Sequence, residues 1–143
     1  MASKPILLVE DNHDDELLLL RAFRKTRSSP GEVVVARDGV EALQRLFGEG
    51  EHAGKAFCPS FVLLDLKLPK VDGLTVLRRI RADARLRSLP VVILTSSREE
   101  RDLAESYAAG ANSFIRKPVD FERFTEAMQT LCTYWAILNE PPP

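Results

Sequence analysis

The stretch Phe61-Val-Leu-Leu-Asp-Leu-Lys-Leu-Pro69 decides the fold, because a run of apolar residues in it ends in a single carboxylate, Asp65. The consecutive apolar residues Phe61 to Leu64 predict a strand covered on both faces, since a strand with one wet face would alternate polar and apolar residues. Asp65 then lies at the carboxyl end of this strand. Ligands bind at that edge of open α/β sheets, so Asp65 is a candidate functional residue.

The composition predicts one compact domain. The chain has 143 residues, of which 45% are hydrophobic, and one domain typically has roughly 100–200 residues. The 20 basic and 21 acidic residues give a net charge of −1, which provides no bulk attraction to nucleic acid or to an anionic membrane. Cys58 and Cys132 lack the spacing of a metal or redox motif, which favours two reduced thiols. No apolar run approaches the ~20 residues of a membrane span, and the N-terminal run is too short for a signal peptide. We therefore expect a soluble cytoplasmic protein.

Apolar runs alternate with helical patterns along the chain. Further strands are predicted at 6–9, 33–35, 91–94 and 112–115. Helices are predicted at about 14–27, 40–47, 74–84, 98–109 and 120–138. This alternation predicts a parallel sheet with helices on both faces, which is a three-layer α/β sandwich.

Two polar features of these helices have simple structural interpretations. The side chains of residues 12–15 are predicted to cap the first helix, which is acidic at its start. The third helix carries arginines on its polar face, which are predicted to point into solvent: Arg78, Arg79, Arg81 and Arg85.

Polar side chains follow directly after most of the predicted strands. They are Glu10 and Asp11, then Asp65, then Thr95 and finally Lys117. Because the carboxyl ends of parallel strands line one edge of a sheet, we expect these side chains to converge. Three neighbouring carboxylates need a cation between them, and hard oxygen ligands suit Mg²⁺. A hydroxyl and an ammonium suit an anion beside that cation, so the set has the parts needed for phosphoryl transfer onto a carboxylate.

In order and spacing, these motifs resemble those of the receiver domains of two-component response regulators. The matching segments are Val9-Glu-Asp-Asn12, Leu64-Asp-Leu-Lys-Leu-Pro69 with Asp72-Gly73, Leu94-Thr-Ser-Ser97 and Phe114-Ile-Arg-Lys-Pro118. The resemblance covers about residues 5–131. It implies a flavodoxin-like (βα)5 fold with the sheet order 2-1-3-4-5.

The resemblance also implies the roles of the acidic residues. Asp65 matches the phosphoacceptor, and Asp11 matches the direct metal ligand. Glu10 matches the second acid of the pocket, acting through water. The backbone carbonyl of Lys67 falls where the family supplies a further metal ligand.

The remaining matches concern the phosphoryl group and the switch. Thr95 and Lys117 match the phosphoryl-binding hydroxyl and ammonium, and Phe114 matches the aromatic switch position. A cis Lys117–Pro118 bond is also implied, and X-Pro bonds are the ones for which the cis form is cheap.

Lys67, two residues after Asp65, occupies a position that varies in the family. The residue at this position is thought to control how water reaches the phosphoryl group. We hypothesise that its cationic side chain lies over the site. Removing it in Lys67→Ala is then expected to change the lifetime of phosphorylated Asp65. An unchanged lifetime, measured by decay of the phosphorylated protein, would contradict the hypothesis.

The last helical pattern is apolar almost all round from Leu131 to Leu138. One apolar stripe would suffice for the core, so the surplus, including Trp135 and Ile137, would be exposed. Exposed apolar patches usually mark interfaces. We therefore expect a homodimer through this helix, alone or with the helix at 98–109. The alternative is a longer helix that folds back on its own domain.

Neither a DNA-binding motif nor a catalytic module follows the receiver pattern. We expect a single receiver domain spanning residues 1–143, which takes a phosphoryl group from a sensor histidine kinase onto Asp65 with Mg²⁺ and signals through protein contacts. Its only catalysis would be its own phosphorylation and dephosphorylation. The long C-terminal helix also resembles that of small regulators paired with phytochrome-type kinases.

Two other functions are compatible with the pattern. One is an aspartate-nucleophile phosphohydrolase, although such enzymes typically carry a second acid where Lys67 stands. The other is a phosphorylation-independent scaffold with a vestigial pocket, against which the intact acidic set argues.

Overall fold

A computed structural model of the chain describes residues 4–26, 31–55, 57–117 and 120–143. This part contains a five-stranded parallel sheet in the order β2-β1-β3-β4-β5. The strands are β1 (Ile6–Val9), β2 (Val33–Ala36), β3 (Phe61–Leu64), β4 (Val91–Thr95) and β5 (Ser113–Arg116). The expected sheet order is confirmed.

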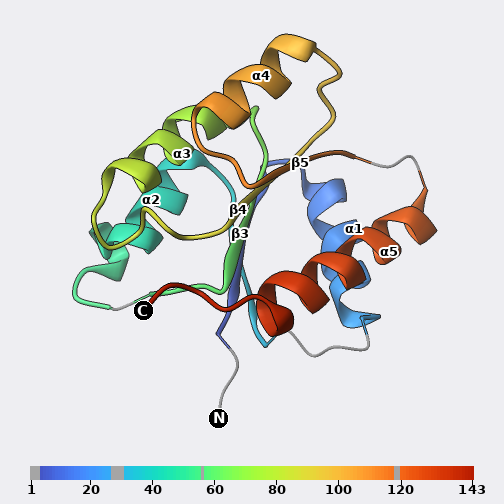
Figure 1. Cartoon of the computed structure of the whole chain (residues 1–143), viewed down its shortest axis with the longest axis horizontal. Helices are drawn as coiled ribbons and strands as arrows, with labels where there is room; N and C mark the ends of the chain where they lie inside the picture. The colour runs from blue at the N-terminus through green and yellow to red at the C-terminus, as the bar shows by residue number, and fades with distance from the viewer. Residues whose placement is uncertain (1–3, 27–30, 56, 118–119) are drawn as a thin grey trace.

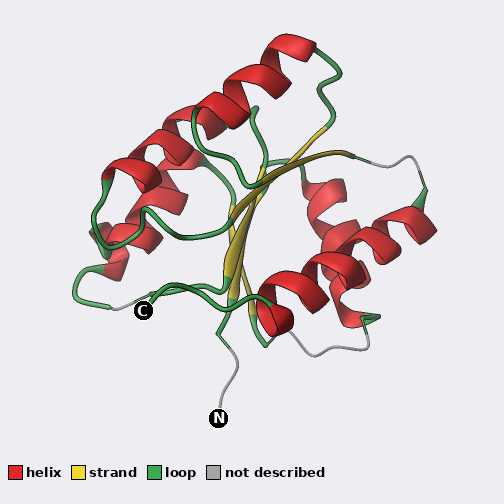
Figure 2. Cartoon of the chain, in the orientation of Figure 1, coloured by secondary structure: helices red, strands yellow, loops and turns green. Residues whose placement is uncertain are grey.

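Helices cover both faces of this sheet. They are α1 (His13–Arg24), α2 (Gly39–Phe47), α3 (Gly73–Ala82), α4 (Glu100–Ala108) and α5 (Phe121–Leu131). Figures 1 and 2 show α1 and α5 together on one face, and α2 and α3 on the other. The predicted three-layer α/β sandwich is therefore confirmed. No helix in the described residues is long and apolar enough to cross a membrane.

The central strand β3 is buried on both faces, as its apolar run predicts. Phe61 and Leu63 belong to the core under α1 and α5, whereas Val62 and Leu64 belong to the core under α2 and α3. Each such fully buried side chain stabilises the fold by about 1.5–3 kcal/mol. β3 thus contributes side chains to both cores, and its carboxyl end places Asp65 at the edge of the sheet.

The C-terminal helical segment differs from the single helix expected at 120–138. α5 ends at Leu131, and Cys132–Leu138 form a wider π-helical segment, η2, in which the Asn139 N–H bonds to the Tyr134 carbonyl at 2.7 Å. In η2, Trp135 packs against the domain's own core, and Tyr134 lies against its ring edge-on. The apolar pattern identifies the helical segment, but it does not distinguish a wider turn from an α-helical one.

Arg81 is half-buried and hydrogen-bonded to other segments, in contrast to the solvent-exposed position expected for the polar face of α3. Its guanidinium donates to the carbonyls of Gly110 at 2.9 Å and Leu89 at 2.7 Å. It also donates to the Asn112 side chain at 2.8 Å, and that oxygen accepts the Val91 N–H at 2.8 Å. Burial lowers the Arg81 pKa. Arg81 therefore connects α3 to the starts of β4 and β5.

Replacing Arg81 with alanine is expected to destabilise the protein by about 2–4 kcal/mol, because several partly buried acceptors lose their donor. Urea unfolding measures this free energy. Arg78 is exposed on the same helix, so Arg78→Ala is the matched control and should change stability by less than about 0.5 kcal/mol. Equal stability of the two variants would show that the Arg81 hydrogen bonds contribute nothing net.

Candidate functional site

The acids expected at the strand ends lie together at the carboxyl edge of the sheet. β1 and β3 pair directly, with Val9 opposite Leu64, and the Asp65 N–H bonds to the Val9 carbonyl at 3.1 Å. One carboxylate oxygen from each of Glu10, Asp11 and Asp65 lies within 4.8 Å of the other two. Glu10 and Asp65 are buried, whereas Asp11 is exposed.

Lys117 brings a buried cation to these acids from the end of β5. The backbone N–H of Lys117 donates to the Thr95 carbonyl at 2.8 Å, so the pairing of β4 with β5 continues to this residue. Its ammonium contacts Glu10 Oε1 at 2.7 Å, Asp65 Oδ2 at 2.9 Å and Asp15 Oδ2 at 2.7 Å. Burial lowers the Lys117 pKa, but the three carboxylates outweigh it and raise this pKa above its ordinary value. Lys117 is therefore a fixed positive charge.

Glu10 is the acid of this site whose pKa is clearly raised. Burial raises its pKa from 4.5 to about 7, opposed by the hydrogen bond from Lys117 and reinforced by the charge of Asp65. Of the carboxylates that contact the Lys117 ammonium, Glu10 is the most buried, and burial is the main cause of its raised pKa. A cation bound among the acids would favour the ionised form of Glu10.

The metal-free protein is expected to become less stable as the pH rises through this range. A pKa raised from 4.5 to about 7 on folding means that the folded state holds a proton that the unfolded state releases. The stabilisation is complete below pH 4.5 and is lost as the pH rises through about 7, amounting to roughly 3 kcal/mol. Urea unfolding in EDTA across this range measures it. Glu10→Gln, which cannot ionise, should flatten the dependence; an equally steep dependence in this variant would assign it to other groups.

Thr95 is buried at the end of β4, and its hydroxyl is tied to the loop that leads into α4. Thr95 Oγ1 accepts the Ser97 N–H at 3.3 Å. The Ser97 hydroxyl in turn donates to Asp102 Oδ2 in α4 at 2.5 Å. A displacement of the Thr95 hydroxyl would therefore disturb Ser97 and, through it, the hydrogen bond to Asp102 of α4.

Phe114 lies in β5, and Lys67 follows two residues after Asp65. Phe114 is half-buried in β5 and packs against the core under α2 and α3, and the Arg116 guanidinium lies 5.8 Å from its ring centre. The Lys67 N–H bonds to Asp65 Oδ1 at 3.3 Å. The Lys67 side chain is exposed and forms no ion pair within the described residues. Pro118, and with it the expected cis bond, lies outside the described residues.

Asp15 is the residue of this site that the sequence pattern did not reveal. An acid in the first turn of a helix looks like an ordinary partner of the helix dipole. Asn12 caps α1 by accepting the Asp15 N–H at 2.9 Å. This cap fixes the turn from which the Asp15 carboxylate reaches Lys117.

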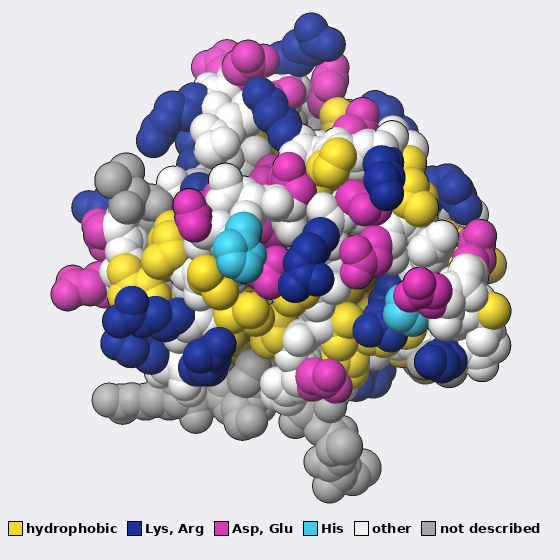
Figure 3. All heavy atoms as spheres, turned by 180° about the vertical axis from the view of Figure 1, so that it is seen from behind, with side chains coloured by type: hydrophobic (Ala, Val, Ile, Leu, Met, Phe, Trp, Pro, Cys, Tyr) yellow, Lys and Arg dark blue, Asp and Glu magenta, His cyan; other side chains and the backbone are white. Residues whose placement is uncertain are grey.

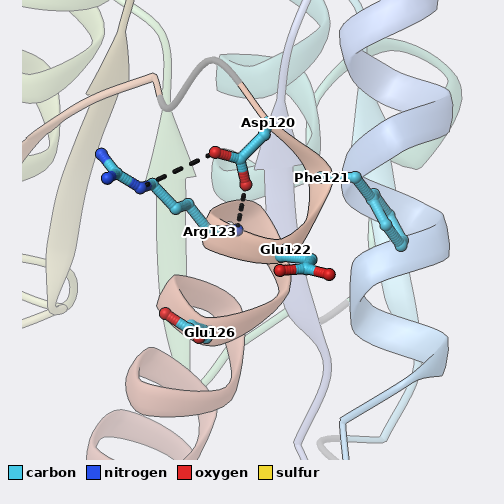
Figure 4. A pocket seen from close by; sticks show the side chains of 5 residues that line it. All are labelled: Asp120, Phe121, Glu122, Arg123 and Glu126. Atoms are coloured by element: carbon cyan, nitrogen blue, oxygen red, sulfur yellow. Dashed lines mark hydrogen bonds and ion pairs between the residues drawn. The ribbon is translucent and has the colours of Figure 1, made fainter.

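A separate surface pocket of about 440 Å³ lies at the start of α5. Figure 4 shows its lining of Asp120, Phe121, Glu122, Arg123 and Glu126, with Phe121 pointing toward α1. There the Phe121 ring meets the Arg21 guanidinium at 4.6 Å. None of the strand-end residues lines this pocket, so it supplies no groups to the acidic site.

The donor set of the acidic site fits a hard divalent cation. Carboxylate oxygens from Glu10, Asp11 and Asp65 are close enough for one ion to neutralise all of them, and such oxygens are the ligands that Mg²⁺ and Mn²⁺ prefer. On the face of the molecule shown in Figure 3, basic and acidic side chains are interspersed. The site is thus a local concentration of negative charge with one buried ammonium.

Comparison with known proteins identifies this arrangement. Residues 6–129 match the model of the response regulator receiver domain. The chain belongs to this family. Phosphoryl acceptance by an aspartate is typical of the family, and its members are signalling modules that bind a divalent metal.

Several relatives resemble the chain over nearly its whole length. The probable methanogenesis regulatory protein FilR2 of Methanothrix harundinacea is 42% identical over 138 residues, which are 96% of this chain and 86% of that protein. The structure of the phosphorylated cyanobacterial phytochrome response regulator RcpA has a TM-score of 0.90 at 38% identity, covering 99% of this chain and 100% of that one. The Mn²⁺-bound form of response regulator Rcp1 has a TM-score of 0.87 at 33% identity, covering 98% and 99%. The chain is therefore related to phytochrome response regulators.

Proposed function

We propose that Asp65 of this response regulator accepts a phosphoryl group from a phosphohistidine of a sensor kinase. The buried Asp65 carboxylate supports this most directly, because its Oδ2 lies 2.9 Å from the Lys117 ammonium at the open edge of the sheet. In the transfer, an Asp65 oxygen forms a bond to phosphorus while the bond from phosphorus to the imidazole nitrogen breaks. Lys117 and the Thr95 hydroxyl would hold the peripheral phosphoryl oxygens.

The metal in this proposal is Mg²⁺. Glu10, Asp11, Asp65 and the backbone carbonyl of Lys67 would hold it, with Glu10 acting through water. When bound, Mg²⁺ neutralises the charge that develops on the transferred phosphoryl group. The Mn²⁺-bound form of Rcp1 supports a divalent ion in a related protein.

Phosphorylation by a small donor tests the proposal without knowledge of the kinase. Acetyl phosphate with Mg²⁺ is expected to add the mass of one phosphoryl group to the intact protein. EDTA and the variant Asp65→Asn should each abolish the addition. An unlabelled wild-type protein would favour the scaffold alternative, and steady turnover of phosphate esters would favour a phosphohydrolase.

The switch in this proposal consists of Thr95 and Phe114. Movement of the Thr95 hydroxyl toward a phosphoryl group would release the Ser97 N–H that it accepts at 3.3 Å. Ser97 also bonds to Asp102 of α4, so the change would reach that helix. Phe114 would then repack beside it, and the altered surface would signal by protein contact.

A phytochrome-type histidine kinase is the proposed partner class, supported by the similarity to RcpA. The chain would act in the cytoplasm as a receiver domain. Phosphotransfer from a panel of autophosphorylated kinases, with Asp65→Asn as control, identifies the donor. A preference for kinases unrelated to phytochromes would overturn the partner class while leaving Asp65 as the acceptor.

A homodimer through η2 is the proposed assembly. Tyr134, Ile137 and Leu138 are 50%, 56% and 65% exposed, although Trp135 between them packs against the domain itself. Large apolar side chains exposed within one short segment are a common feature of interfaces. Light scattering at micromolar concentration should give a dimer, and Ile137→Ser should shift it toward the monomer. A wild-type monomer, with and without a phosphoryl mimic, would contradict the assembly.

A further inference from the structure

The ammonium of Lys117 has all of its hydrogen-bonding capacity occupied by carboxylates. An ammonium has three N–H donors, and Lys117 lies 2.7 Å from Glu10, 2.7 Å from Asp15 and 2.9 Å from Asp65. Glu10 and Asp65 come from neighbouring strand ends. Asp15 comes from the first turn of α1 instead, and only 9% of the Lys117 side chain remains exposed between them.

Asp15 differs from the other two partners in its relation to the acidic cluster. The close group of carboxylates comprises Glu10, Asp11 and Asp65, and Asp15 is outside it. A divalent cation in that group would share the charges of Glu10 and Asp65 and would repel the nearby ammonium. Asp15 is then the partner of Lys117 whose charge stays fully available to it.

We propose that Asp15 is a positioning residue, which keeps the Lys117 ammonium beside Asp65 when a divalent cation occupies the acidic cluster. The proposal rests on phosphoryl acceptance by Asp65. In the acyl phosphate, Asp65 loses its charge because one oxygen is bonded to phosphorus. The N–H that Lys117 donates to Asp65 then turns to a phosphoryl oxygen, while the bond to Asp15 holds the ammonium in place.

Neutralising Asp15 has opposite expected effects on the affinity for an anion, depending on whether Asp15 acts only through its charge or by holding Lys117 in place. Removing a negative charge from the neighbourhood should by itself raise the affinity for an anion. Releasing Lys117 should lower that affinity by about tenfold, the value of one charge-assisted hydrogen bond. Asp14 is exposed on the same turn of α1, so Asp14→Asn makes the same change of charge and is the matched control.

The test is the affinity for beryllofluoride, a phosphoryl mimic, in saturating Mg²⁺. We expect about a tenfold loss in Asp15→Asn, no loss in Asp14→Asn and partial recovery in Asp15→Glu. Side-chain NMR of Lys117 in the Mg²⁺-loaded protein should show increased mobility in Asp15→Asn only. Equal affinities in the two asparagine variants, or a loss without increased Lys117 mobility, would overturn the proposal. Failure of the wild-type protein to bind beryllofluoride would instead overturn phosphoryl acceptance itself.

Discussion

Replacing Lys117 with methionine is expected to destabilise the metal-free protein by roughly 3–5 kcal/mol, because it leaves buried carboxylates without their cation. In the wild type this ammonium contacts Glu10, Asp15 and Asp65 within 2.9 Å. Saturating Mg²⁺ should remove most of the difference, since the ion supplies the missing positive charge to the same acids. Urea unfolding in EDTA and in Mg²⁺ measures both values.

Lys70 provides the matched control for this substitution. Its ammonium pairs with Asp38 at 3.5 Å, but the Lys70 side chain is 66% exposed. Lys70→Met should therefore cost less than about 1 kcal/mol, and Mg²⁺ should not change that cost. If Lys117→Met were equally destabilised with and without Mg²⁺, the ammonium and the metal would not neutralise the same acids.

The variant Gly73→Ala is expected to disturb both the fold and the site. A methyl group at Gly73 would lie 2.2 Å from the Asp65 carbonyl oxygen and 2.7 Å from the Leu66 Cα. Both neighbours are backbone atoms, so the connection between β3 and α3 must move. Overpacking of this kind costs about 1–3 kcal/mol, and the displaced Asp65 should be phosphorylated far more slowly.

Two measurements test the Gly73 prediction. Urea unfolding gives the loss of stability, and the rate of phosphorylation by acetyl phosphate gives the effect on the site. Thr75 is exposed in the same first turn of α3, so Thr75→Ala is the control and should leave the phosphorylation rate unchanged. A normal rate in Gly73→Ala would show that the connection adapts without moving Asp65.

The layered fold is largely predictable from the sequence because the buried strands are continuous apolar runs. Phe61–Leu64 has no polar residue, so both of its faces must be covered, and the structure places a helical layer on each. The order of the strands is different. Parallel neighbours are joined through helices, and no local pattern states which strands pair, so the order 2-1-3-4-5 followed from the resemblance.

The partners of individual charged residues were not predictable in the same way. Apolar spacing places Arg81 on the polar side of α3, but it gives no sign of the acceptors that β4, β5 and their loops bring to it. In the sequence, Asp15 is indistinguishable from an ordinary acid at the start of a helix. Its partner Lys117 is 102 residues away in sequence and reaches the Asp15 carboxylate only in the folded protein. Such contacts depend on the three-dimensional arrangement and on side-chain reach. Spacing along one helix contains neither.

The position of the phosphoryl group tests the central claim most directly. After reaction with acetyl phosphate and Mg²⁺, borohydride reduction converts an aspartyl phosphate into homoserine, which peptide mass spectrometry locates. Phosphoryl acceptance at the end of β3 predicts homoserine at position 65 and nowhere else. Homoserine at another aspartate, or its absence from phosphorylated protein, would contradict the assignment of Asp65 as the acceptor.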